Sequence, residues 1–218
     1  MDFTVHQDQL ALARLRAEGG FFGDKLTGLN LRSLYAANCD LNEVVLERCE
    51  LAESNFGGAR VRRVTVAHTS LRGAKLSAVR LERTELYFSD LNESRFDGLG
   101  ARRLKLHGCE ANNASFEGAR IAVARFEETK LYKANFNGAM LVRVAFLDDK
   151  LGGSSLDKAT FDGARLVDVA LKSANLRGAS FRNATLFGVD FTDAALEGAD
   201  FTGARAVGCQ MPAEFKFE

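Results

Sequence analysis

The stretch LYKANFNGAMLVRVAF, residues 131–146, places an apolar residue at every fifth position. The same period runs without a break from Phe21 to Met211, over 39 positions of which 20 are Leu and 11 are Phe. An α-helix repeats every ~3.6 residues and a strand every ~2, so neither could keep this period on one buried side. A fixed short period is typical of a solenoid, in which each repeat buries its apolar residue by stacking on the next.

A second regular position lies two residues before each apolar one and is mostly small. The other three residues of each quintet are mostly polar, charged or Gly, as an outer surface requires. Gly is frequent two residues after the large one, which suits a corner with an unusual backbone angle. Ala36 and Ala101 are small where a large residue is expected, but Leu34 and Leu99, two residues earlier, are large. We therefore expect each pair to conserve the buried volume.

Residues 134–138 (ANFNG), 174–178 (ANLRG) and 199–203 (ADFTG) resemble the A-[DN]-[LF]-x-x unit of the pentapeptide repeat family. The resemblance extends over most of the chain. It implies an all-β fold, a right-handed quadrilateral β-helix with four quintets in each coil. About nine to ten coils are then expected, in a rod roughly 45–50 Å long at ~4.8 Å per coil.

A solenoid has to cap its exposed core, and both ends of this chain depart from the repeat. We expect residues 1–20 to form an N-terminal cap, residues 21–211 the β-helix and residues 212–218 a C-terminal capping tail. Within the cap, residues 7–18 are predicted to form a short amphipathic helix that ends at Gly19-Gly20. The side chains predicted to cover the first coil are Leu10, Ala11 and Leu15.

Two further expectations concern the course of the chain. Phe215 and Phe217 alternate with charged residues, which predicts a short strand or flap over the last coil. The repeat shows no inserted loop. Its register places Asp149 inside the rod, where a carboxylate needs a partner or a protonated state, so we expect a local bulge near Gly152-Gly153 that brings Asp149 to water.

The composition narrows the function. Lys and Arg together number 29, as do Asp and Glu, so the net charge is zero. This argues against a generally basic nucleic-acid binder and against a strongly acidic polymer. The sequence has no transmembrane segment and no visible signal peptide, so the expected location is cytoplasmic. Cys39, Cys49, Cys109 and Cys209 all fall at the small interior position, as free core thiols would.

One face of the predicted rod is rich in arginine, because residues 20 apart share a face when each coil has four quintets. From residue 60 to residue 143 this face has one acidic outward residue, Glu82. A compact patch of one sign raises the local potential, and Arg favours two-point contact with carboxylate or phosphate. The alternative is a solvated surface with chance clustering. The residues of this basic face are Arg60, Arg62, Arg63, Arg80, Arg83, Arg102, Arg103, Arg120 and Arg143.

The adjoining face has an aromatic patch, formed by His68, Tyr87, Phe88 and His107. The register stacks His68 with Phe88 and Tyr87 with His107. Exposed aromatic residues beside arginines are typical interface anchors, although ordinary stacking of outward side chains is the alternative. A catalytic site is not expected there, because the surface is convex and lacks a nucleophile with a positioned base.

The face opposite the basic face is mildly acidic over its first half and turns basic further along. The acidic residues are Glu50, Glu53, Asp90, Glu93 and Glu110, and the later basic residues are Lys130, Lys133 and Lys150.

These patterns favour a non-enzymatic rigid scaffold that binds a partner protein through the basic face and the aromatic patch. No phosphate loop, hydrolase motif or metal signature occurs in the sequence, so we expect no catalytic residue, no metal and no cofactor. The family resemblance implies an alternative, a DNA mimic that binds DNA gyrase or a related topoisomerase through the acidic residues. A second alternative is backbone-led binding of nucleic acid or another anionic polymer through the arginines. The oligomeric state stays open, with a homodimer through the C-terminal coil as one option.

Overall fold

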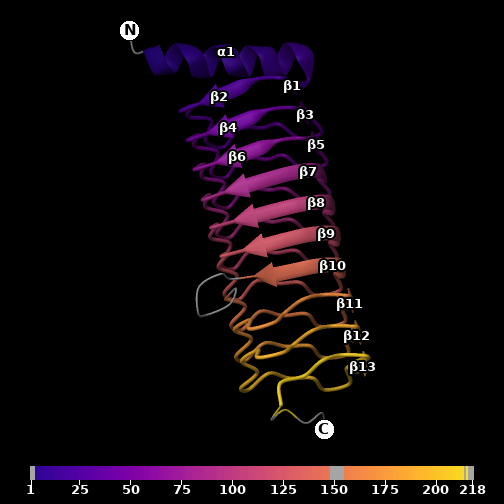
Figure 1. Cartoon of the computed structure of the whole chain (residues 1–218). Coiled ribbons are helices and arrows are strands. Elements are labelled where there is room, and N and C mark those ends of the chain that lie inside the picture. Colours follow the sequence, from indigo (N-terminus) through magenta and orange to yellow (C-terminus); the bar gives the residue numbers. More distant parts are fainter. Residues whose placement is uncertain (1–2, 148–154, 214, 216–218) are drawn as a thin grey trace.

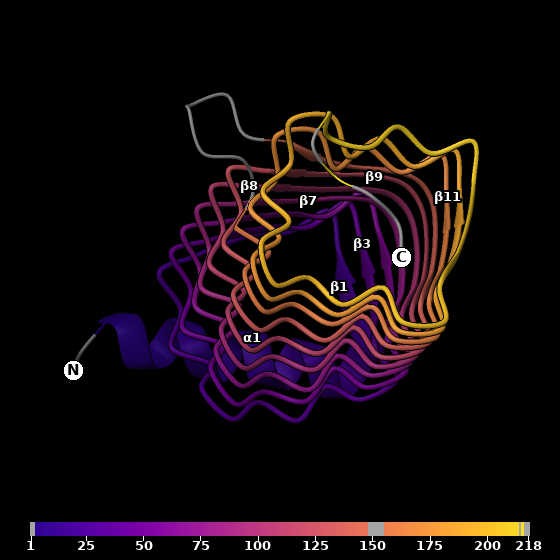
Figure 2. The same cartoon turned by 90° about the horizontal axis from the view of Figure 1, so that it is seen from below.

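A computed structural model describes residues 3–147, 155–213 and 215 of the chain. These residues form a rod of stacked coils with one helix across its N-terminal end (Figure 1). All of the strand pairs are parallel. Viewed along its axis, the rod has four sides (Figure 2). The structure therefore confirms the predicted β-helix with a short N-terminal helix. Its elements are α1 (Phe3–Glu18), β1 (Gly20–Phe22), β2 (Lys25–Thr27), β3 (Asp40–Asn42), β4 (Val45–Glu47), β5 (Arg60–Arg62), β6 (Thr65–Ala67), β7 (Arg80–Tyr87), β8 (Gly100–His107), β9 (Arg120–Glu127), β10 (Met140–Leu147), β11 (Arg165–Val167), β12 (Thr185–Phe187) and β13 (Arg205–Val207).

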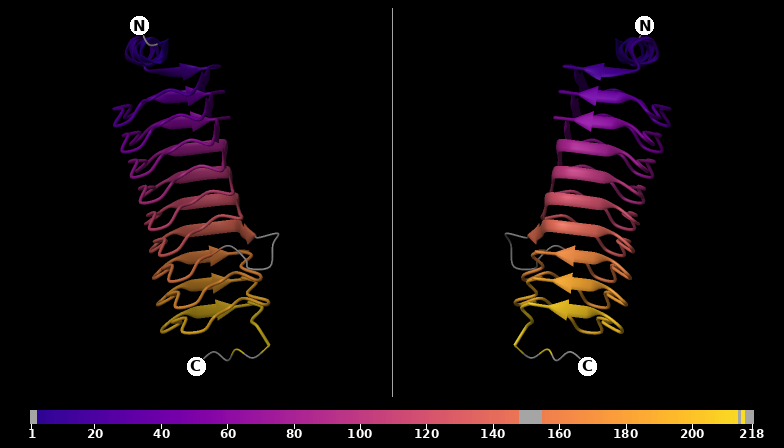
Figure 3. Two further views of the ribbon diagram at one scale, coloured as in Figure 1. Left: turned by 90° about the vertical axis from the view of Figure 1, so that its left-hand side faces the viewer. Right: turned by 90° about the vertical axis from the view of Figure 1, so that its right-hand side faces the viewer.

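The four sides of the rod differ in how their backbones pair. Face 1 contains β1, β3, β5, the first halves of β7–β10, and β11–β13. Face 2 contains β2, β4, β6 and the second halves of β7–β10, because these longer strands turn the corner between the two faces. On faces 3 and 4, successive coils pair through isolated β-bridges. These bridges run from Asn30 to Ala195 on face 3 and from Tyr35 to Asp200 on face 4. The side views in Figure 3 show this stacking along the whole rod.

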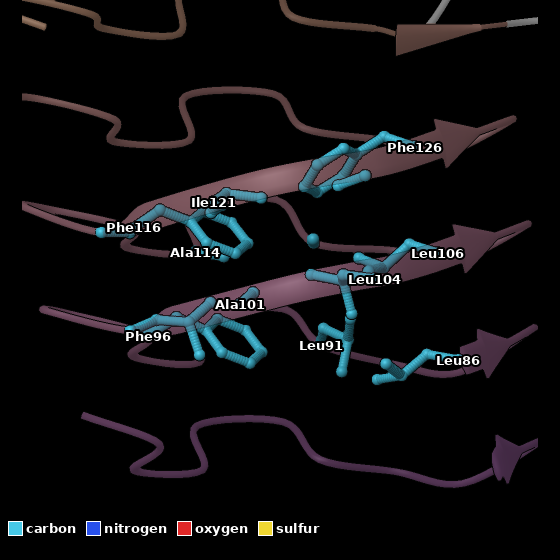
Figure 4. Packing of buried hydrophobic residues seen from close by; sticks show 14 of the residues in the cluster. Leu86, Leu91, Phe96, Ala101, Leu104, Leu106, Ala114, Phe116, Ile121 and Phe126 are labelled. Carbon is cyan, nitrogen blue, oxygen red and sulfur yellow. The ribbon is translucent and has the colours of Figure 1, made fainter. Parts of the chain in front are cut away.

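The five-residue period fills the interior of the rod. On face 4, the rings of Phe96, Phe116 and Phe136 stack with centroids 4.8 Å apart and planes within 4°. Figure 4 shows the first two of these rings one above the other. Phe126 on face 2 meets Phe116 and Phe136 edge-on, at 6.1 and 6.4 Å. The stacking distance equals the spacing of hydrogen-bonded strands, ~4.8 Å, so backbone pairing and ring contact are satisfied together.

The exchange of large and small residues predicted at two places is confirmed. Leu34 and Ala36 are both buried, as are Leu99 and Ala101. Each Leu therefore lies inside the coil and compensates for the missing volume of the neighbouring Ala.

The corners explain the glycine pattern. In the described residues from Phe21 to Gly208, the backbone φ is positive two residues after each inward residue, at glycines such as Gly118 (φ 63°) and also at other residues such as Arg103 (φ 58°). A residue other than Gly pays a steric cost in this left-handed region, which accounts for the frequency of Gly at the corner.

The expectation of a repeat without insertions is wrong. β9 pairs with β10 at a separation of 20 residues, with Glu127 opposite Leu147, whereas β10 pairs with β11 at a separation of 25, with Met140 opposite Arg165. The extra five residues enter between Leu147 and Ser155. The interior stack continues past this point, since the rings of Phe136 and Phe161 lie 5.0 Å apart. Asp149, Lys150 and Gly152-Gly153 lie outside the described residues.

Helix α1 covers part of the first coil. Ala11 and Leu15 are buried as predicted, but Leu10 is 57% exposed and Leu12 packs against the core in its place. A helix presents only about a third of its circumference to a flat coil end, and residue 12 is on the covered side. Gly19, at φ 69°, donates its N–H to the carbonyl of Leu15 and ends the helix as predicted.

The opposite end of the rod is less well covered. The ring of Phe215 packs edge-on against Phe201, at 5.3 Å, which places this residue over the last coil as predicted. Ala206 is nevertheless exposed, and Met211 is half-buried. Phe217 lies outside the described residues.

Three of the four cysteines are core residues. Cys39, Cys49 and Cys109 are buried, whereas Cys209 in the last coil is half-buried, and all four are free thiols. Burial raises the pKa of Cys39 and of Cys109 to about 11, because the apolar interior disfavours a thiolate.

The ring stack predicts where the fold is most sensitive. Phe136→Ala should lower the free energy of unfolding by ~3–5 kcal/mol, because it removes a fully buried ring and leaves a cavity. Urea unfolding followed by circular dichroism measures the change. Tyr35→Ala is the matched control, since Tyr35 is 75% exposed and should shift stability by less than ~0.5 kcal/mol. Equal effects of the two substitutions would contradict the packing described above.

Thiol labelling tests the burial of the cysteines. With Ellman's reagent at pH 8, the native protein should react quickly at Cys209 alone, because the other three thiols are buried and the thiolate is the reactive form. All four should react in denaturant. Fast native labelling of Cys109, identified by mass spectrometry, would show that the central coils open.

Candidate protein-binding face

The basic face predicted from the sequence is face 1. Its nine arginines lie on β5, β7, β8 and β9, or at the corner between faces 1 and 2, and all nine side chains are exposed. The strand pairing places Arg60 beside Arg80 and leaves Arg62 and Arg102 on either side of Glu82. The structure therefore brings the predicted residues together on one side of the rod.

Four of these arginines form a column along the corner. Arg63, Arg83, Arg103 and Arg143 have φ values of 52°, 52°, 58° and 52°. Each occupies the same corner position of its coil, with Val123 between the last two. The corner directs these side chains away from the core, into solvent, so none is needed for packing.

Within the part of the chain that the structure describes, most arginines of the basic face have no neutralising partner. Arg63 pairs with Glu43, and Arg60 lies 3.9 Å from Asp40, at the N-terminal edge of the face. Among the described residues, no ion pair or side-chain hydrogen bond engages the remaining seven. Like charges in adjacent coils repel one another, and a ligand with carboxylates or phosphates relieves that repulsion. These seven are Arg62, Arg80, Arg83, Arg102, Arg103, Arg120 and Arg143.

Two basic residues across the corner were missed by the sequence analysis. Lys105 and Arg125 on face 2 line a shallow groove of about 470 Å³ together with Arg103 and Arg143. Both also contact Glu127, at 2.8 and 3.6 Å. Sorting the outward residues face by face separates them from the arginines, although the corner column lies between the two faces.

The aromatic patch also forms as predicted, with Tyr87 and His107 on face 2 and His68 and Phe88 at its corner with face 3. The rings of His68 and Phe88 stack with centroids 5.4 Å apart, and His107 meets Phe88 edge-on at 5.2 Å and Tyr87 at 6.2 Å. Phe88 is 51% exposed. Its ring lies over Gly108, where an added Cβ would come within 2.5 Å of the ring, so the absence of a side chain at position 108 permits this arrangement.

The polar atoms of the patch are partly engaged. The Tyr87 hydroxyl donates to Glu85 Oε2 at 2.7 Å, and this hydrogen bond raises the pKa of Tyr87. His107 Nδ1 lies 3.4 Å from Glu127 Oε2. The Tyr87 hydroxyl is therefore hydrogen-bonded, whereas His107 Nδ1 makes no hydrogen bond among the described residues.

The acidic residues of face 3 are largely neutralised within that face. Glu53 pairs with Arg32 at 3.1 Å, Glu93 pairs with Arg72, and Glu110 pairs with Lys130 at 2.7 Å. The hydrogen bond from Lys130, together with its charge, lowers the pKa of Glu110.

The other two acidic residues of face 3 bind the backbone. Glu50 accepts from the N–H of Ala52 at 3.2 Å, and Asp90 accepts from that of Asn92 at 2.9 Å. Lys133 places its ammonium group 5.2 Å from the centre of the Tyr132 ring. Three of the five acidic residues of face 3 are thus paired with a cation, and the other two are hydrogen-bonded to the backbone.

The described part of the chain contains no cluster of three His, Cys, Asp or Glu side chains that could hold a metal ion. Within the same residues, α1 is too short and too polar to cross a membrane. The arrangement that the structure does provide is a flat, charged face beside a group of exposed rings, which is suited to binding.

Comparison with known proteins agrees with this architecture. The family model described as pentapeptide repeats matches residues 30–66, 62–98, 102–138, 112–146, 150–178 and 164–203, as eight copies. The solved structure of HetL, a pentapeptide repeat protein involved in heterocyst differentiation regulation from the cyanobacterium Nostoc sp. strain PCC 7120, is 24% identical with a TM-score of 0.39, over 93% of this chain and 96% of HetL. Full-length QnrB1, a plasmid-mediated fluoroquinolone resistance protein, is 18% identical with a TM-score of 0.45, over 86% of this chain and 93% of QnrB1. Among curated proteins, no sequence matches this chain.

Proposed function

Because this chain belongs to the pentapeptide repeat family, we propose that it is a non-enzymatic scaffold that binds a partner protein through the arginines of face 1. The observation that carries the proposal is the set of seven exposed arginines without an ion pair among the described residues. The rod holds them in place through a packed interior, so little conformational entropy of the scaffold is lost on binding. We further propose the cytoplasm as its location, on the sequence grounds given above.

A protein partner fits better than an anionic polymer. The face is flat, so it cannot enter a groove of duplex DNA, and polymer binding would depend on phosphate contacts alone. The exposed Phe88 ring and its stacked neighbour His68 lie at the far corner of face 2, the face that adjoins the basic face. Aromatic and Arg side chains together are the residue types enriched at protein–protein hot spots.

The alternative of a gyrase-binding DNA mimic would use the acidic residues of face 3. A DNA mimic has to present unpaired negative charge to a surface built for phosphates. Glu53, Glu93 and Glu110 are instead paired with basic residues of their own face, which weakens this alternative. It remains an outcome of the experiment below.

A homodimer through the C-terminal coil is compatible with the scaffold proposal. Ala206 and Val207 are exposed there, and Met211 is half-buried. A dimer at that end would leave the arginines of face 1 free, since these lie between β5 and β10.

Affinity capture from native cell lysate tests the proposal. The wild type should retain a specific protein, and the triple variant Arg62→Glu, Arg83→Glu, Arg103→Glu should lose it, with affinity reduced at least tenfold, or about 1.4 kcal/mol. The loss should follow from reversed charge on a preformed surface, so binding by the wild type should also weaken as salt is added. Titration of the identified partner by isothermal calorimetry measures both effects.

The matched control is Lys75→Glu, Lys133→Glu, Lys172→Glu, which makes the same change in net charge at exposed residues on faces 4, 3 and 2. It should bind as the wild type does. Gyrase subunits retained equally by wild type and both triple variants would support the DNA-mimic alternative and overturn the proposal. Loss of the partner with both triple variants would assign binding to net charge and not to face 1.

A further inference from the structure

Face 1 changes character along the rod. The strand pairing places Arg102 beside Ala122 and Ala122 beside Val142. Beyond the inserted residues, Val142 pairs with Val167, which pairs with Phe187, which pairs with Val207. The side chains of this column point outward, and those of Phe187 and Val207 are 53% and 59% exposed. This outward column therefore passes from charged side chains into apolar ones, with exposed Arg165 and Arg205 two residues before Val167 and Val207 on the same strands.

Exposed apolar side chains are concentrated on this face. Of the eight large hydrophobic residues that are exposed in the described chain, four lie on its C-terminal half or at its corner: Val123, Met140, Phe187 and Val207. Phe22 on β1 is a fifth residue of face 1. An even distribution over four faces would not give this pattern, and contiguous exposed apolar surface is typical of interaction sites.

Val123 provides independent support. It is 46% exposed and has a φ of 56°. Among the described non-glycine residues with positive φ, no other is β-branched. A β-branched side chain in the left-handed region is a genuine steric outlier. Such strain without burial is not explained by packing, and strained residues cluster at functional sites. Val123 lies between Arg103 and Arg143 at the corner and follows Ala122 of the column.

We propose that face 1 is a single bipartite docking surface for a protein whose contact surface is acidic against the arginines and apolar against the column from Val142 to Val207. The inference rests on the proposed function and specifies its partner. The surface runs over the eight strands from β5 to β13 on face 1, seven coil steps of ~4.8 Å or roughly 34 Å. The surface is about 10 Å wide, because each strand contributes three residues to it. One α-helix of roughly 23 residues would therefore cover it.

Two other occupants fit less well. A nucleic acid would engage the arginines but leave the apolar half in water. A second copy of this chain would pair the face with itself through a two-fold axis. If the two rods ran antiparallel, the arginines of each copy would lie on the apolar half of the other, and if they ran parallel, arginine would face arginine. Charge complementarity therefore favours a different protein that is acidic and apolar at opposite ends of its contact.

Site-directed photocrosslinking tests the proposal in intact cells. A benzophenone side chain is introduced at Arg102, at Phe187, or at the exposed control position Tyr35 on face 4. Positions 102 and 187 should crosslink to the same polypeptide, identified by mass spectrometry, and position 35 should not. Crosslinks from position 102 alone would overturn the bipartite surface and leave the scaffold proposal intact. No crosslink from position 102 would contradict the scaffold proposal itself.

A binding titration with the purified partner, once crosslinking has identified it, distinguishes the contribution of the apolar column from that of the arginines. Phe187→Ser with Val207→Ser should weaken binding roughly tenfold, as expected for losing one or two buried apolar contacts, at low and at high salt alike. The arginine triple variant should instead lose affinity mainly at low salt. Tyr35→Ser is the control and should bind as the wild type. Unchanged affinity of the Phe187 and Val207 variant would overturn the inference.

Val123→Asn distinguishes a role of Val123 in binding from a purely structural role. Asn tolerates positive φ better than Val, so the melting temperature should rise by about 2–4 °C, while binding weakens severalfold through the lost apolar contact. A variant that is more stable and binds equally well would show that Val123 takes no part in docking.

Discussion

The spacing between coils governs every other feature of the rod. Parallel strands pair at ~4.8 Å, and each inward side chain must pack against a copy of its own position one coil away. Flat aromatic rings satisfy that distance directly, as the 4.8 Å stack of Phe96 on Phe116 shows. The interior therefore constrains two residues of each quintet and leaves the outward residues free. Function has to be sought in those free residues, because the core serves the same purpose at every coil.

The constraint also explains how the rod accepts five extra residues. A solenoid coil contacts only the coils before and after it, so residues can leave the coil at a corner provided that the flanking positions regain their partners. Phe136 and Phe161 do so across the insertion, with planes 4° apart. Surface insertions cost little loop entropy, and the ladder of inward residues is what has to stay continuous.

The period alone predicted a solenoid, because a five-residue repeat suits neither a helix nor a flat sheet. The four-sided β-helix followed from the resemblance to the pentapeptide repeat family. A local bulge near Gly152-Gly153 was expected from the register of Asp149, but an insertion of a whole quintet could not be predicted, since Leu151 continues the period through it. That omission hid the apolar column: counting by 20 residues places Val142 over Asp162, whereas the true pairing places it beside Val167. The basic face was found because its arginines precede the insertion. Leu10 was misplaced because the rotation of a capping helix depends on contacts such as that of Asp8 with the N–H of Asn30, which the helix pattern does not contain.

A protein with equal numbers of acidic and basic residues presents a strong local field only if its opposite charges are segregated or unequally paired. Here faces 3 and 4 hold pairs such as Arg177 with Glu197 at 3.3 Å and Arg182 with Asp162 at 3.5 Å, while the arginines from Arg62 to Arg143 lack such partners among the described residues. Exposed ion pairs contribute little to stability, so the pairs on faces 3 and 4 are unnecessary for the fold. Their effect is to offset part of the charge on those two faces. An apolar continuation of face 1 then restricts what can bind: charge draws many acidic partners toward the rod, and the apolar half selects among them.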